Sequence, residues 1–171
     1  PGDALIEARF TTGHDDVILV TAEGMSIRFH EDGVRTMGRA AAGVRGIRVG
    51  KDDHVVALSI VSKDATLLVA GENGIGKRTD FDDYRVQSRG GKGIKTMKIT
   101  KKTGKVVGGL TVHEGDEIML ITVGGQMVRT SVDGVRQTGR NAQGVRLVNV
   151  DDKDRLQDIA PVVSAEKEEE A

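Results

Sequence analysis

The chain has 171 residues, a formal net charge of −1 at neutral pH and no cysteine. Its length is sufficient for one domain with a hydrophobic core, and the lack of cysteine excludes a disulfide framework and a thiolate metal site. No apolar run approaches the roughly 18 residues that a membrane helix requires, so we expect a cytoplasmic protein without a membrane partner.

The first predicted element, residues 4–10, resembles the last strand of each later unit, so residues 1–14 are expected to be the end of a preceding blade or a first exchanged strand. From residue 15 onwards, a pattern of glycine and basic residues occurs three times, about 50 residues apart. The matching stretches are Gly24–Arg28, Gly74–Arg78 and Gly125–Arg129, followed by Gly38–Arg45, Ser88–Lys95 and Gly139–Arg146. Periods of 20 to 50 residues predict stacked repeats, each of which is one supersecondary unit.

Each repeat predicts four short strands. The first is a run rich in β-branched residues (17–20, 66–69 and 118–121), and a glycine turn typical of a hairpin leads to the second. A third strand (44–49, 94–99 and 145–150) and a fourth strand (55–61, 106–112 and 156–163) follow. We expect an all-β, propeller-like partial ring of three four-stranded blades at residues 15–63, 64–115 and 116–163, with a disordered acidic tail at 164–171.

Basic residues gather in the same half of every repeat. Residues 28–51 contain six bases and two acids, residues 77–105 contain ten and three, and residues 129–146 contain four and one. Stacking of the repeats in a common orientation would align these halves as one positive stripe, which indicates a polyanion as partner.

No pattern in the chain predicts catalysis. Gly71–Lys77 fits the phosphate-binding pattern G-x-x-x-x-G-K, but Arg78 stands where that motif needs a Ser or Thr for Mg²⁺, and a strand follows instead of a helix. We interpret this segment as a hairpin turn, and the acids that recur near the turns as caps of backbone amides. The four histidines have no ligand spacing. We therefore predict no catalytic residue, no metal site and no cofactor in this chain.

The segment Gln87–Gly93 carries the strongest binding signal. Its glycines would let a phosphate approach backbone N–H groups, and Arg89 and Lys92 would supply charge, although a solvated basic loop is the alternative. With no Trp, one Tyr and three Phe, the chain has too few aromatic residues to stack single-stranded bases. Double-stranded DNA, held by its phosphates without sequence preference, is the partner that this composition favours.

These residues resemble the glycine-rich basic box and the blades of the DNA gyrase A C-terminal domain. The supporting stretches are Gly43–Arg48, Asn73–Thr79 and Gly139–Val145, and the resemblance covers about residues 3–163. It implies a β-pinwheel, a disc whose blades exchange strands and whose basic rim wraps duplex DNA. The chain departs from the family in having three repeats where the pinwheel usually has six, and in Ser88, which stands where the box has a basic residue.

The resemblance implies a non-catalytic module of an ATP-dependent type II topoisomerase that supports negative supercoiling in the bacterial nucleoid. Its partners would be duplex DNA, the rest of the gyrase A protein and the gyrase B protein, with self-association of this three-repeat chain as a further expectation. The alternatives are the corresponding C-terminal domain of topoisomerase IV and a propeller-like protein-interaction scaffold. The expected DNA-binding residues are Arg28, Arg35, Arg39, Arg45, Arg78, Arg85, Gln87, Arg89, Gly90, Gly91, Lys92, Gly93, Lys95, Arg129, Arg136, Arg140 and Arg146.

Overall fold

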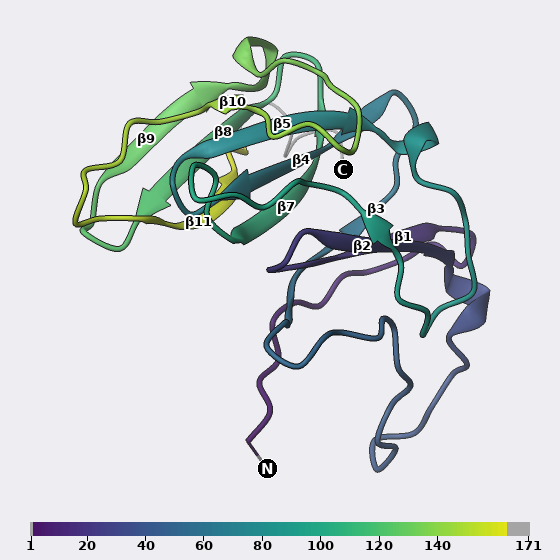
Figure 1. Cartoon of the computed structure of the whole chain (residues 1–171). Coiled ribbons are helices and arrows are strands. Elements are labelled where there is room, and N and C mark those ends of the chain that lie inside the picture. Colours follow the sequence, from purple (N-terminus) through teal and green to yellow (C-terminus); the bar gives the residue numbers. More distant parts are fainter. Residues whose placement is uncertain (1, 164–171) are drawn as a thin grey trace.

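The computed structural model describes residues 2–163, and the expected acidic tail at 164–171 lies outside them. The described chain is all-β, as predicted, and its 11 strands form three antiparallel sheets. Figure 1 shows the sheet of the second repeat lying between those of the first and the third. Three short 3₁₀ turns, η1 (Glu31–Gly33), η2 (Phe81–Asp83) and η3 (Val132–Gly134), are its only helical elements among residues 2–163.

Every repeat is built on a β-hairpin, a 3₁₀ turn, a long loop and a returning strand. The hairpins are β1 (Asp16–Thr21) with β2 (Met25–His30), β4 (Ala65–Gly71) with β5 (Ile75–Asp80), and β8 (Glu117–Thr122) with β9 (Met127–Ser131). The returning strands are β3 (Val55–Ile60), β7 (Val106–His113) and β11 (Leu156–Pro161). Each returning strand pairs with the first strand of its own hairpin, which therefore lies in the interior of the sheet.

The fourth strand of a sheet comes from the next repeat. β6 (Ile94–Lys95) leaves the second repeat to pair with β2 of the first, and β10 (Val145–Arg146) leaves the third repeat to pair with β5 of the second. The sheet orders are therefore β3-β1-β2-β6, β10-β5-β4-β7 and β11-β8-β9. We call residues 43–48, 93–98 and 144–149 the hooks of the three repeats.

Several strand predictions are wrong in detail. The third blade has three strands instead of four, because within residues 2–163 no further hook reaches the outer edge of β9. The strands expected at 94–99 and 145–150 shorten to two residues each, and the one expected at 44–49 does not form. Residues 4–10 also form no strand, and the Leu5 and Phe10 side chains are exposed. A strand needs a paired backbone partner along its length, and residues 4–10 have none among the described residues.

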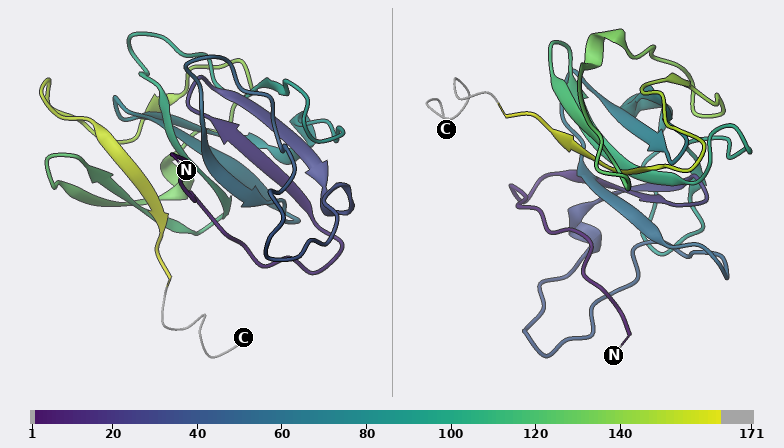
Figure 2. Two further views of the ribbon diagram at one scale, coloured as in Figure 1. Left: turned by 90° about the horizontal axis from the view of Figure 1, so that it is seen from below. Right: turned by 90° about the vertical axis from the view of Figure 1, so that its left-hand side faces the viewer.

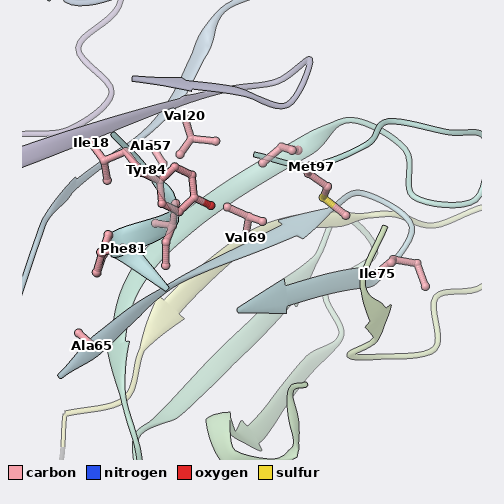
Figure 3. Packing of buried hydrophobic residues seen from close by; sticks show 11 residues of the cluster. Ile18, Val20, Ala57, Ala65, Val69, Ile75, Phe81, Tyr84 and Met97 are labelled. Carbon is pink, nitrogen blue, oxygen red and sulfur yellow. The ribbon is translucent and has the colours of Figure 1, made fainter. Parts of the chain in front are cut away.

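The hydrophobic core lies between successive sheets. Ile18 and Val20 of β1 pack with Leu67 and Val69 of β4, and alternate residues of β4 face the other way, toward the third sheet. Figure 3 shows the first of these clusters, in which the ring of Tyr84 is buried among aliphatic side chains. All seven residues of β4 are buried, as expected for a strand covered on both faces.

We predict that Gly93→Ala destabilises the fold by about 1–3 kcal/mol more than Gly115→Ala. Both glycines have positive φ (73° and 80°), so both substitutions strain the backbone similarly. A Cβ at Gly93 would also overlap the carbonyl oxygen of Ser26, whereas nothing lies within 4 Å of one at Gly115. Urea unfolding of the two variants measures the difference, and equal losses would contradict the tight approach of the hook to β2.

Candidate nucleic-acid interface

Two of the arginines expected to contact DNA are occupied inside the protein. The Arg28 guanidinium binds Asp16 with an Nη2–Oδ2 distance of 2.8 Å, and its Nη1 donates to the Phe81 carbonyl of the next repeat at 2.8 Å. Arg78 is 6% exposed, and its Nε donates to the carbonyl of Val135, also in the next repeat, at 2.8 Å. Because their donors already have protein acceptors, we leave both residues out of the candidate interface.

Two arginines near the start of the basic glycine loops Ser88–Lys95 and Gly139–Arg146 also reach across the repeat boundary, from the following repeat to the preceding one. Arg89 donates through Nε to the Gly33 carbonyl at 2.6 Å and through Nη1 to the Arg45 carbonyl at 3.1 Å. Arg140 similarly donates to the Lys95 carbonyl at 2.9 Å. Both side chains are half-buried, so they fasten the previous hook and present only part of their charge to solvent.

Two rows of basic side chains remain exposed at equivalent positions of the three repeats. The first row follows the 3₁₀ turns and consists of Arg35, Arg85 and Arg136, and the second lies in the hooks and consists of Arg45, Lys95 and Arg146. Lys92 and Arg39 in the box loops are exposed as well. In the part of the chain that the structure describes, the cationic groups of these eight residues donate to no protein acceptor.

The box glycines serve the packing of the loop. The N–H of Gly90 donates to the carbonyl of Gly46, the Gly91 carbonyl accepts from Arg48, and Gly93 lies tightly against the backbone of Ser26. Gln87 is half-buried, and its N–H donates to the Arg28 carbonyl at 2.8 Å. Two backbone N–H groups of the expected phosphate cradle, those of Gln87 and Gly90, thus donate to protein carbonyls.

Sequence reasoning missed the role of Lys77 in the basic loop of the third repeat. This side chain is fully buried, and its Nζ donates to the carbonyls of Gly139, at 2.7 Å, and Arg140. Burial, helped by the nearby Arg140 charge, lowers the pKa of Lys77 from 10.5 to about 8. The signal was present in the alignment of the repeats, because Lys77 stands where the other two have the apolar Ile27 and Val128.

Neither a metal centre nor a membrane span is found in residues 2–163. No group of three or more His, Asp and Glu side chains there is arranged to hold a metal ion. No helix in these residues is long and apolar enough to cross a membrane.

The fold and the repeated basic rows define a propeller-like domain of the β-pinwheel type. The chain matches the family "DNA gyrase C-terminal domain, beta-propeller" over residues 15–62, 65–113 and 116–162. It belongs to this family, and is thus a C-terminal domain of the DNA gyrase A kind.

Relatives with curated names support this assignment. The chain is 44% identical over 172 residues to the DNA gyrase A protein of Mycolicibacterium smegmatis and 42% identical over 169 residues to that of Escherichia coli. Each match covers 99% of this chain but only about a fifth (20% and 19%) of the relative.

Two solved structures share the fold. A structure of the DNA gyrase A C-terminal domain aligns with a TM-score of 0.82 and 30% identity, covering 88% of this chain and 51% of that one. The C-terminal domain of DNA topoisomerase IV aligns with a TM-score of 0.83, covering 89% of this chain and 48% of that one. At 24% identity, the second likeness shows the fold alone.

We predict that Arg78→Met lowers the free energy of unfolding by about 1–3 kcal/mol, because it leaves the buried carbonyl of Val135 without its donor. The matched control is Arg85→Met, which removes the same charge from an exposed side chain and should change stability little. Denaturant titration of both variants tests the assignment. A similar stability for the two would show that Arg78 does not hold the repeats together.

A second prediction concerns pH and Lys77. Its folded-state pKa of about 8 is below the ordinary 10.5, so the unfolded chain binds the extra proton between these values, and stability rises with pH there. Relative to Lys77→Met, the free energy of unfolding of the unmodified chain should therefore rise by about 1 kcal/mol between pH 7.5 and 9.5. This is less than the full pKa shift would give, because the loop that covers the ammonium is in contact with solvent. Urea unfolding at both pH values measures the gain, and a constant difference would contradict a depressed pKa.

Proposed function

We propose that this domain binds and wraps duplex DNA without sequence preference, and that it thereby supports ATP-dependent negative supercoiling by DNA gyrase. The observation that carries the proposal is the pair of exposed basic rows, Arg35, Arg85 and Arg136 with Arg45, Lys95 and Arg146. These exposed side chains recur once in every repeat, about 50 residues apart in the sequence. Phosphate contacts supply sequence-independent affinity.

The contacts between successive repeats indicate how this domain would bend a duplex that it binds. The arginines that cross the repeat boundaries fix each sheet against its neighbour, so the basic rows lie on a stiff scaffold. When a duplex bends to follow basic residues held in this way, additional phosphate contacts offset its bending energy. Wrapping then requires no base-specific contact and no aromatic platform, which agrees with the buried positions of Phe29, Phe81 and Tyr84, since Phe10 alone among the four aromatic side chains is exposed.

The domain would act together with other parts of the enzyme. The chain spans about a fifth of the length of the relatives it matches. We propose that DNA cleavage and ATP hydrolysis belong to the rest of the gyrase A protein and to the gyrase B protein, that this domain is not catalytic by itself and needs no cofactor, and that the assembly works in the bacterial cytoplasm.

The test is the salt dependence of duplex binding by the double variant Arg85→Ala, Arg136→Ala. Each lost phosphate contact should reduce the slope of log K against log salt by about 0.9, so the slope should flatten by about 2 on any duplex sequence. The control Lys63→Ala, Lys153→Ala removes two exposed bases that lie outside the rows and should leave the slope nearly unchanged.

Two other results would each reject the proposal. An equal loss of slope in both double variants would remove the basic rows from the interface. A chain that folds but has no affinity for duplex DNA at low salt would favour the protein-interaction scaffold instead.

A further inference from the structure

A lysine of the second repeat lies buried beneath the basic glycine loop of the third repeat. Lys77 is on β5, in the sheet that Figure 2 shows between the sheets of the other two repeats, and its side chain is fully buried. Its Nζ donates to the carbonyl of Gly139 at 2.7 Å and to the carbonyl of Arg140. A buried ammonium is costly unless acceptors surround it. The loop carbonyls therefore stabilise the charge, and the charge in turn holds the loop.

The loop of the second repeat, residues 88–95, is fastened by backbone hydrogen bonds instead. The N–H of Gly90 donates to the Gly46 carbonyl at 2.5 Å, and the N–H of Arg48 donates to the Gly91 carbonyl at 2.7 Å. Both bonds join this loop to the first hook. A loop that is held in this way needs no ammonium beneath it.

The loop of the third repeat, residues 139–146, lacks this pair of bonds. At the equivalent places, Asn141 and Ala142 form no backbone hydrogen bond to the second hook in the described part of the chain. Lys77 supplies a replacement from beneath, at the place where the loop of the second repeat covers the apolar Ile27. The lysine is therefore the contact that distinguishes the third loop from the second.

Charged groups on two elements act on the Lys77 ammonium. The Arg140 guanidinium of the loop repels it, and the Asp83 carboxylate of η2 attracts it. The neighbouring strand β4 has no ionisable side chain, and Arg146, the ionisable residue of β10, is exposed. Burial, followed by the charge of Arg140, lowers the pKa of Lys77 to about 8 despite Asp83. The loop thus rests on a group that exchanges its proton just above neutral pH.

A duplex bound along the basic rows would favour the protonated lysine. Arg136 precedes the loop and Arg146 ends it, and both are exposed, so bound phosphates would bring negative charge to the loop. This charge offsets the repulsion between Arg140 and Lys77 and favours the ammonium. An ammonium also donates stronger hydrogen bonds than a neutral amine, which orders the loop further. Because coupled binding equilibria are reciprocal, protonation of the lysine in turn favours the duplex.

We propose that Lys77 is a positioning residue for DNA binding, which holds the basic glycine loop of the third repeat in place for the phosphates and takes up a proton when the duplex binds. Lys77 itself touches no phosphate, because it lies beneath the loop. No covalent bond between heavy atoms changes: a proton moves from the buffer to Nζ, and it returns when the duplex dissociates. This inference rests on the proposed duplex binding.

The direct test is the titration of Lys77 in the unmodified chain, followed by the NMR signal of its Cε carbon, which Lys77→Met identifies by its absence. Without DNA the midpoint should lie near pH 8. With saturating duplex it should rise by about 0.5, because the phosphates favour the ammonium. An unchanged midpoint would overturn the proposal, since a lysine that only supports the fold does not respond to DNA.

The pH profile of duplex affinity is the second test. Between pH 7 and 9.5 at constant salt, the affinity of the unmodified chain should fall about threefold more than that of Lys77→Met, as a rise of about 0.5 in the midpoint implies. The control Lys153→Met removes an exposed lysine of the third repeat and should keep the profile of the unmodified chain. Methionine suits the site, because the equivalent residues are the apolar Ile27 and Val128.

The outcomes separate the role of Lys77 from duplex binding itself. Equal pH profiles for Lys77→Met and the unmodified chain, with duplex binding intact, would overturn the role of Lys77 and leave duplex binding standing. A folded, unmodified chain without affinity for duplex DNA at low salt would overturn both. If Lys77→Met does not fold, the change in the titration midpoint on addition of duplex to the unmodified chain decides the question.

Discussion

The structure depends on one constraint, namely that the outer strand of each sheet must come from the next repeat. The hairpin of a repeat leaves the N–H and C=O groups along its outer edge unpaired, and such groups are costly when they are buried. The hooks satisfy them through β6 and β10, and the N–H groups of Thr96 and Leu147 donate to the carbonyls of Gly24 and Gly74. A repeat therefore cannot complete its sheet alone, and the three behave as parts of one fold.

This constraint also separates the arginines into two groups. Arg28 and Arg78 on the hairpin edges, and Arg89 and Arg140 at the start of the basic loops, bind backbone carbonyls of the neighbouring repeat. Those after the 3₁₀ turns and within the hooks stay in solvent, at equivalent positions in successive repeats. The same repeat pattern thus produces two features side by side, namely the arginine–carbonyl contacts between repeats and a row of exposed basic residues. The contacts hold the row in place, and the proposed DNA path runs along this row.

The sequence was sufficient to predict the fold class and the three repeats, since hairpin turns and β-branched runs are local signals. Local signals could not show that the strand expected at 94–99 would join another sheet, because exchange depends on which edge lies nearby in space, and only the resemblance to the family implied it. For the same reason Arg28 and Arg78 looked like members of the basic stripe. In the sequence Arg28 and Arg78 are equivalent to the exposed Arg129. The three differ only in whether a following repeat supplies backbone carbonyls for the arginine to bind. Lys77 was recognisable only as a lysine at an otherwise apolar position of the repeats.

The most direct measurement is native-state hydrogen exchange of the hook amides. The amides of Thr96 and Leu147 donate across the repeat boundaries, and the amide of Leu68 lies in the buried centre of β4. If the exchanged strands hold the repeats as one unit, all three amides become accessible to hydrogen exchange only through the same opening of the structure. Their free energies of opening should then be equal, and should fall together in Gly93→Ala. Exchange of the hook amides through a separate opening of much lower free energy, with Leu68 still protected, would contradict the claim that the repeats form a single cooperative unit.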